Sequence, residues 1–88
     1  VAAICAAPGL VLSQLKGIKG AKVTCYDGFE HKLTEAGAVF EPRAAITSGR
    51  IITGRSPGHA LSFAFEILKK VCPEKLEEVK ENLFLKTL

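Results

Sequence analysis

The sequence predicts an α/β fold with a mostly parallel sheet, resembling the C-terminal part of an α/β sandwich. Three observations support this prediction. Residues 1–4 form an apolar run that suits a parallel strand buried on both faces. Residues 57–71 carry apolar positions at helical spacing, and Ser48-Gly49 lies between two strand-like segments, as in a hairpin. The chain of 88 residues therefore reads as strand, helix, strand, hairpin, helix and helix.

The first half of the chain alternates between strand and helix. The first strand ends at Cys5, and we expect a helix over residues 6–16, with Gly17 as the residue that follows it. Residues 21–26 alternate well enough to form a second strand. The polar residues 30–37 are expected to hold a short helical turn.

The second half begins with two strands, over residues 39–47 and 50–54. Their hairpin would place an antiparallel element on an otherwise parallel sheet. The next helix is expected over residues 57–71, with Pro57 in its first turn and Ser56 as its N-cap. One face of this helix is apolar and should be buried: Leu61, Ala64, Phe65, Leu68 and Cys72. A final helix beginning at Pro73 should bury Leu76, Val79 and Leu83.

Composition excludes several classes of protein. The net charge of +3 is weak and dispersed, so we expect no nucleic-acid partner. No apolar stretch approaches the roughly 18 residues of a membrane span, so we expect no membrane partner. Three cysteines are an odd number without Cys-x-x-Cys spacing, which favours a reducing, cytoplasmic location and gives no zinc pattern.

Cys5 is the candidate nucleophile, because it lies where the first strand changes to a helix. Its sulfur would lie over the first unpaired N–H groups of that helix, and these groups stabilise a thiolate. A turn of this kind resembles the strand–nucleophile–helix elbow of α/β enzymes. The alternative is a buried structural cysteine, since free cysteine is among the most buried residue types.

Residues 1–4 also bear on domain organisation. A strand buried on both faces needs neighbouring strands on each side, and 88 residues supply few of them. We therefore expect residues 1–88 to be one part of a larger domain. The alternative is a complete small domain, which at this length would be only marginally stable.

Three segments, in order along the chain, carry a resemblance to a known family. They are residues 2–8 (AAICAAP), residues 22–26 with 28–30 (KVTCY and GFE), and residues 51–58 leading into 63–68 (IITGRSPG and FAFEIL). Each resembles a segment in the C-terminal half of the DJ-1/PfpI (ThiJ) family. Ala6 follows the nucleophile, where the peptidase-like branch has a histidine, so the resemblance is to the DJ-1-like branch.

The resemblance implies a flavodoxin-like (class I glutamine amidotransferase-like) three-layer sandwich. Residues 1–88 would then be the C-terminal half of a single domain, with the N-terminal half missing or on another chain. That half would supply a glutamate that hydrogen-bonds Cys5. The resemblance also implies a homodimer of the complete protein, with the turn at residues 54–58 near the active site and the interface. It implies no cofactor and no metal.

The resemblance also suggests roles near Cys5. The residue after such a nucleophile is Ala6, whose backbone N–H would stabilise an oxyanion. Some family members place a histidine where this chain has Tyr26 or Cys25. The Tyr26 hydroxyl could instead hydrogen-bond a bound carbonyl, or Tyr26 could simply pack. His31 and His59 are expected on the surface rather than as bases.

Two functions of different classes follow. The first is a glutathione-independent glyoxalase or deglycase, in which the Cys5 thiolate adds to a small 2-oxoaldehyde such as methylglyoxal. The second is a redox sensor without turnover, since an accessible thiolate is readily oxidised to sulfenic and sulfinic acid. A peptidase role is less favoured because Ala6 stands where the peptidase-like branch has a histidine, and a thiamine-pathway role because nothing in these residues recognises a thiazole.

Overall fold

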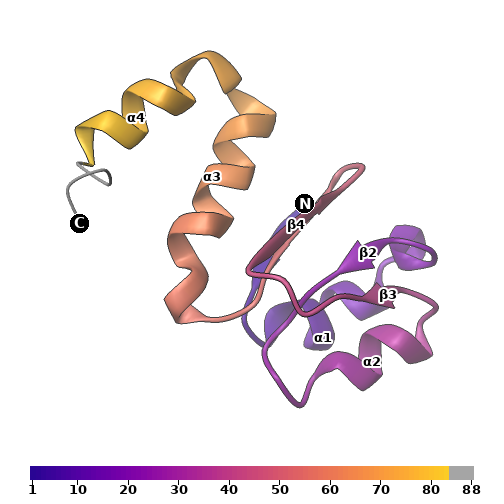
Figure 1. Cartoon of the computed structure of the whole chain (residues 1–88). Helices are drawn as coiled ribbons and strands as arrows, with labels where there is room; N and C mark the ends of the chain where they lie inside the picture. The colour runs from indigo at the N-terminus through magenta and orange to yellow at the C-terminus, as the bar shows by residue number, and fades with distance from the viewer. Residues whose placement is uncertain (84–88) are drawn as a thin grey trace.

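A computed structural model describes residues 1–83 and confirms the α/β fold. Its main sheet has three strands in the order β1 (Ala2–Ile4), β5 (Ile51–Gly54) and β4 (Ala45–Ser48). β1 runs parallel to β5, and β4 runs antiparallel to it (Figure 1). The predicted hairpin is therefore confirmed. Gly49 turns it with a φ of 60°, a conformation that glycine adopts at little cost.

A second, two-stranded parallel sheet pairs β2 (Lys22–Val23) with β3 (Val39–Phe40). The strand predicted over residues 39–47 is thus divided into β3 and β4. Pro42 lies in the break, where it lacks the N–H that a continuous ladder would need. The N–H of Thr24 donates to Thr53 Oγ1 at 2.9 Å and joins this pair to the main sheet.

The helix predicted over residues 6–16 is wrong as a single element. The structure has a four-residue helix, α1 (Ala7–Leu10), followed by two 3₁₀ turns over residues 12–14 and 16–18. Gly9 explains part of the interruption: a Cβ there would lie 2.6 Å from the carbonyl oxygen of Phe29. The segment is therefore shaped by its packing against the loop before α2 (Glu30–Glu35).

The hydrophobic core lies between the sheets and the layer formed by α1, α2 and the 3₁₀ turns. α2 confirms the helical turn expected at residues 30–37, and its Leu33 is fully buried. The core cluster consists of Leu12, Ile18, Ala21, Val23, Cys25, Leu33, Ala38 and Ile51. Burial of this apolar surface fixes the strands that lead to Cys5 and to its neighbours.

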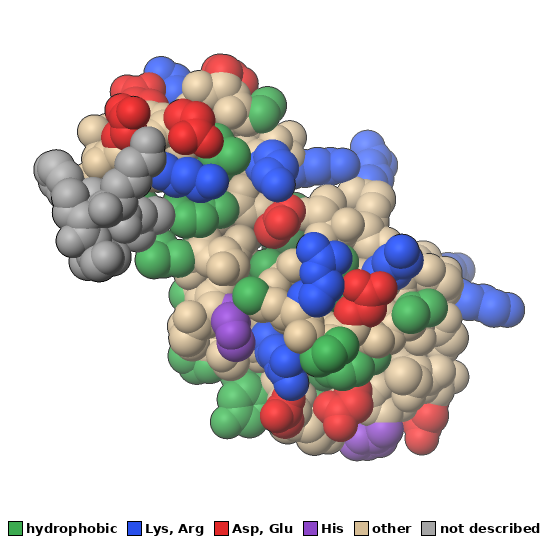
Figure 2. All heavy atoms as spheres, in the orientation of Figure 1, with side chains coloured by type: hydrophobic (Ala, Val, Ile, Leu, Met, Phe, Trp, Pro, Cys, Tyr) green, Lys and Arg blue, Asp and Glu red, His purple; other side chains and the backbone are tan. Residues whose placement is uncertain are grey.

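α3 (Ala60–Val71) and α4 (Leu76–Asn82) follow the sheet, each after a 3₁₀ turn that begins with proline. α3 packs against β4 and β5, and α4 extends beyond it (Figure 1). The predicted burial of both helices is wrong, because none of their residues is fully buried in the part of the chain that the structure describes. Leu61 is 50% exposed and Leu83 is 46% exposed. Hydrophobic side chains accordingly reach the surface along α3 in Figure 2.

β1 is less buried than its apolar sequence predicts. Ala2 is exposed, and Ala3 and Ile4 are half-buried. β5 pairs with β1 along one edge. At the other edge, the carbonyl of Cys5 accepts a hydrogen bond from the N–H of Tyr26 at 2.7 Å. Within residues 1–83, β1 is thus not buried on both faces, and its expected burial in a larger domain stays a prediction.

Candidate active site

Cys5 adopts an unusual backbone conformation between β1 and α1. Its φ is 68°, and it is the one non-glycine residue with positive φ among residues 1–83. A side-chain-bearing residue in this region is strained by about 1–3 kcal/mol and persists only where surrounding contacts hold it. The strand-to-helix turn with a strained residue at its apex is the geometry of a nucleophile elbow.

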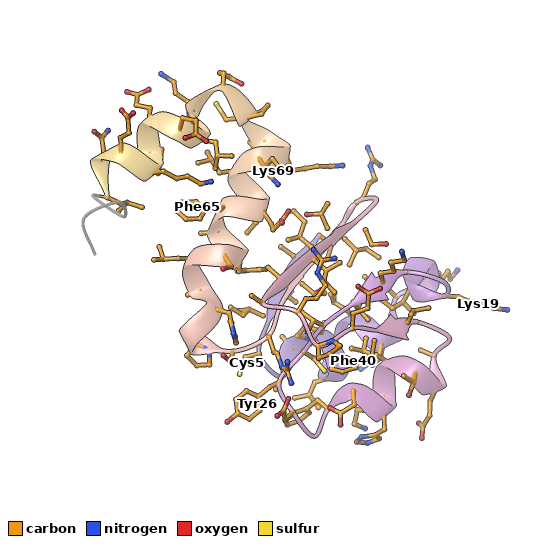
Figure 3. All side chains as sticks on the ribbon, in the orientation of Figure 1. Cys5, Lys19, Tyr26, Phe40, Phe65 and Lys69 are labelled. Carbon is orange, nitrogen blue, oxygen red and sulfur yellow. The ribbon has the colours of Figure 1, made fainter. Side chains whose placement is uncertain are left out.

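Two backbone hydrogen bonds hold Cys5 in place, one to each neighbouring strand segment. Its N–H donates to the carbonyl of Gly54 at 3.0 Å, and its carbonyl accepts from the N–H of Tyr26 at 2.7 Å. Figure 3 shows Cys5 and Tyr26 at the same end of the molecule. As a residue, Cys5 is partly exposed.

Ala6 begins the turn into α1. Its backbone is in the helical region, and its carbonyl accepts from Leu10, so the residue acts as the N-cap of α1. Among residues 1–83, no backbone oxygen accepts a hydrogen bond from the N–H of Ala6. Because α1 has only four residues, few peptide dipoles add up behind Cys5. Any stabilisation of a negative charge here depends on individual N–H groups more than on a helix dipole.

A cavity of about 290 Å³ lies at the ends of the strands that flank Cys5. It is lined by Tyr26, Asp27, Arg55, Ser56 and His59. Tyr26 is itself a hydrogen-bond partner of Cys5, and Arg55 directly follows Gly54, the other partner. The cavity therefore lies where open α/β sheets bind ligands, beyond the carboxyl ends of parallel strands.

An ion pair joins the two walls of this cavity. Arg55 Nη2 donates to Asp27 Oδ1 at 2.6 Å, across 28 residues of sequence. The Arg55 side chain is only 27% exposed, whereas that of Asp27 is 77% exposed. The arginine thus fastens the turn after β5 to the loop that follows residues 22–26.

His59 and Ser56 form a second polar pair in the cavity. His59 Nδ1 lies 2.6 Å from Ser56 Oγ, and both residues are half-buried. The prediction that His59 is a surface residue is therefore wrong. Ser56 does occupy the predicted N-cap position, at the start of the 3₁₀ turn over residues 57–59 with Pro57 in its first turn, but its side chain caps no N–H. The signal was present in the sequence as a Ser-x-x-His spacing across a helix start, which places both side chains on one face.

The other two cysteines differ from Cys5. Cys25 is fully buried, and burial, assisted by the nearby Glu30 carboxylate, raises the pKa of its thiol to about 11. Cys72 is half-exposed rather than in the core as predicted. Its thiol donates to Glu74 Oε1 at 3.1 Å, and this hydrogen bond raises the pKa of Cys72. Neither residue is placed in an elbow.

Two negative findings concern residues 1–83. This part of the chain brings together no group of three or more His, Cys, Asp or Glu side chains suited to a metal ion. None of the helices described is long and apolar enough to cross a membrane. His31 is exposed on α2, as predicted.

Comparison with known proteins relates this chain to a single family. The sequence profile of the DJ-1/PfpI family matches residues 1–70. A glutathione-independent glyoxalase of Caenorhabditis elegans is 35% identical over 86 residues, which cover 97% of this chain and 45% of that protein. An uncharacterized protein of Methanocaldococcus jannaschii is 40% identical over 73 residues, covering 81% of this chain and 35% of that protein.

Solved structures agree with these sequence matches. DJ-1beta of Drosophila melanogaster has a TM-score of 0.83 at 33% identity, covering 94% of this chain and 45% of that one. The oxidized DJ-1 of Toxoplasma gondii has a TM-score of 0.80 at 25% identity, with the same coverage. The chain thus spans less than half the length of these relatives and has the architecture of part of a flavodoxin-like domain. On the profile match, the sequence identities and the fold, the chain belongs to the DJ-1/PfpI family.

Proposed function

We propose that Cys5 is the nucleophile of a cysteine-dependent, glutathione-independent glyoxalase or deglycase that acts on small 2-oxoaldehydes such as methylglyoxal. The observation that carries the proposal is the strained elbow at Cys5, with a φ of 68°, beside a polar cavity. The 35% identity to a protein named as a glutathione-independent glyoxalase supports it. Strain of this kind is characteristic of residues held for function.

The reaction begins when the Cys5 thiolate adds to the aldehyde carbon of methylglyoxal. The new C–S bond leaves an oxyanion at that carbon, which the N–H of Ala6 stabilises, and a proton taken up from water completes the hemithioacetal. The Tyr26 hydroxyl, at the rim of the cavity, donates a hydrogen bond to the neighbouring ketone oxygen. A proton then moves from C1 to C2, which oxidises C1 and reduces C2, and water hydrolyses the resulting thioester to lactate.

The proton transfer at carbon needs a base, which we assign to a glutamate outside residues 1–88. We propose that an N-terminal half of the same domain supplies this carboxylate and covers the exposed faces of β1 and α3. We further propose that the complete protein is a cytoplasmic homodimer. The chain covers only 35–46% of the length of four curated relatives, and a smaller share of two plant relatives. This coverage is consistent with a second half of the domain.

The decisive experiment measures lactate formation from methylglyoxal by the complete protein, without glutathione. Cys5→Ala should abolish turnover, because the C–S bond can no longer form. Cys72→Ala is the matched control and should retain turnover, since Cys72 lies at the end of α3 and hydrogen-bonds Glu74. Full turnover in Cys5→Ala would refute the proposal.

A second candidate function is redox sensing through oxidation of Cys5. It is favoured by the accessibility of Cys5 and by the contrast with Cys25, which is fully buried. A solved structure of the Toxoplasma gondii relative is described as the oxidized protein. Peroxide titration followed by mass spectrometry tests this function: a sensor acquires sulfinic acid at Cys5 but produces no lactate from methylglyoxal.

A further inference from the structure

The cavity beside Cys5 contains one imidazole, that of His59, and its ring is held in a defined orientation. The short contact with Ser56 Oγ, 2.6 Å, engages Nδ1. Within residues 1–83, Nε2 of His59 has no hydrogen-bond partner. His59 lines the cavity, and the contact at Nδ1 leaves Nε2 as the ring nitrogen available to a bound molecule.

The position of His59 relative to Cys5 follows from the strand connections. The N–H of Cys5 donates to the carbonyl of Gly54, and three residues that follow Gly54 line the cavity: Arg55, Ser56 and His59. On the opposite wall, Tyr26 is bonded to the carbonyl of Cys5. Each wall thus includes or directly follows a residue that hydrogen-bonds the Cys5 backbone, so the cavity lies next to the elbow; Cys5 itself is not one of its lining residues.

The remaining charged groups of the cavity do not compete for this role. Arg55 and Asp27 are paired with each other at 2.6 Å and fasten the walls. Tyr26 is 45% exposed at the rim. Imidazole is the side chain best suited to carry a proton in both directions near neutral pH, since it can accept at one moment and donate at the next.

We propose that His59 carries a proton between the two oxygens of the substrate bound to Cys5, and that Ser56 is the positioning residue that orients it. This inference rests on the proposed glyoxalase function and adds a second proton path to it. The glutamate moves a proton between carbons, whereas His59 serves the oxygens.

The step balances without any oxidant or reductant. In the hemithioacetal, the C1–H proton goes to the carboxylate, and its electron pair forms a double bond between C1 and C2. The ketone π pair moves onto the C2 oxygen, which receives a proton from Nε2 of His59. The carboxylic acid then returns its proton to C2, while the C1 hydroxyl gives its proton back to Nε2 and becomes the thioester carbonyl. His59 and the carboxylate both end as they began.

The test compares variants of the two histidines in the complete protein. His59→Ala should lower kcat for lactate formation by about 10²- to 10⁴-fold, the usual contribution of a positioned acid–base group. Its folding should be intact, because the His59 side chain caps no backbone N–H of α3; if His59→Ala does not fold, His59→Gln takes its place with the same expected loss. His31→Ala is the matched control, since His31 is exposed on α2, and should keep kcat within twofold.

Two further measurements separate proton transfer from a structural role. Imidazole added to the buffer should restore turnover in His59→Ala by tenfold or more, and should leave His31→Ala unchanged. The rate at which methylglyoxal adds to Cys5, followed by intact mass, should stay within about threefold of wild type in His59→Ala. Ser56→Ala should lower kcat by about tenfold, as expected for one lost orienting hydrogen bond.

The outcomes distinguish this inference from the function on which it rests. If Cys5→Ala abolishes turnover but His59→Ala retains it within twofold, the role of His59 is refuted and the glyoxalase stands. A large loss in His59→Ala that imidazole does not restore also refutes proton transfer. If the unmodified protein forms no lactate, both the function and the inference are refuted.

Discussion

Replacing Gly54 with alanine should disturb both the stability of the fold and the position of Cys5. A Cβ at Gly54 would lie 2.9 Å from Ile4 Cγ1 and 2.9 Å from the Cδ1 and Cγ atoms of Phe63. Carbon atoms in contact prefer about 3.5–4.0 Å, so β1 or α3 must move by roughly 0.6 Å or more. Overpacking of this kind costs about 1–3 kcal/mol in the free energy of unfolding.

The same substitution reaches the active site through two routes. Ile4 directly precedes Cys5, and the carbonyl of Gly54 accepts the Cys5 N–H at 3.0 Å. A displacement of about 0.6 Å at the nucleophile should lower its rate of reaction with substrate by about tenfold, since roughly 1 Å can cost 10²-fold. Urea denaturation measures the stability change, and iodoacetamide labelling of Cys5 with mass-spectrometric site assignment measures the thiol.

Gly58 provides a matched control in the same turn. A Cβ there meets only Ser56 Oγ at 3.7 Å, which is ordinary van der Waals contact. Gly58→Ala should therefore leave both the unfolding free energy and Cys5 labelling close to wild type. If Gly54→Ala is as stable as Gly58→Ala and labels Cys5 at the same rate, the close packing of β1, β5 and α3 around the elbow is refuted.

Three further predictions concern the cysteines and the cavity wall. At neutral pH, Cys5 should alkylate before the other two cysteines; earlier labelling of Cys25, which is fully buried, would overturn the assignment. The pKa of Cys25 is about 11 in the fold against 9.0 in the unfolded chain, so unfolding releases a proton between these values. Stability should therefore fall as the pH rises from about 9 to about 11, by about 2–3 kcal/mol at about 1.36 kcal/mol per pKa unit. Cys25→Ala should lose this part of the alkaline dependence in denaturation experiments, and an identical pH dependence would contradict the prediction. Arg55→Glu should place two carboxylates together at Asp27, and it should therefore weaken dimerisation and slow Cys5 labelling. Analytical ultracentrifugation measures the dimer, and thiol titration measures the labelling. A variant that stays dimeric with unchanged labelling would place the interface elsewhere.

Local sequence patterns predicted the order of the elements because each pattern depends on neighbouring residues alone. Ser48-Gly49 gave the hairpin, since a turn needs only a few residues with the right backbone freedom. The periodicity of residues 60–71 gave α3. The periodicity could not predict how deeply that helix is buried, because it identifies which residues share a face but not what packs against that face.

Tertiary contacts account for what the sequence could not predict. The helix after Cys5 is short partly because Gly9 packs against the backbone of Phe29, a residue 20 positions later. The ion pair between Arg55 and Asp27 spans 28 residues and has no local signature. Cys5 itself was predicted from residue type and position, but its positive φ was not, since propensity disfavours that conformation for any residue other than glycine.

The two hydrogen bonds of Cys5 couple the nucleophile to its cavity. One bond comes from the end of β5, after which the chain forms the wall that contains Ser56 and His59. The other comes from Tyr26, which belongs to the opposite wall. A shift of either strand therefore moves Cys5 together with the wall that follows that strand. The distance from Cys5 to that wall is preserved, whereas the distance from Cys5 to the opposite wall changes. The ion pair between the walls opposes that change, and it thereby helps to keep the elbow in its strained conformation.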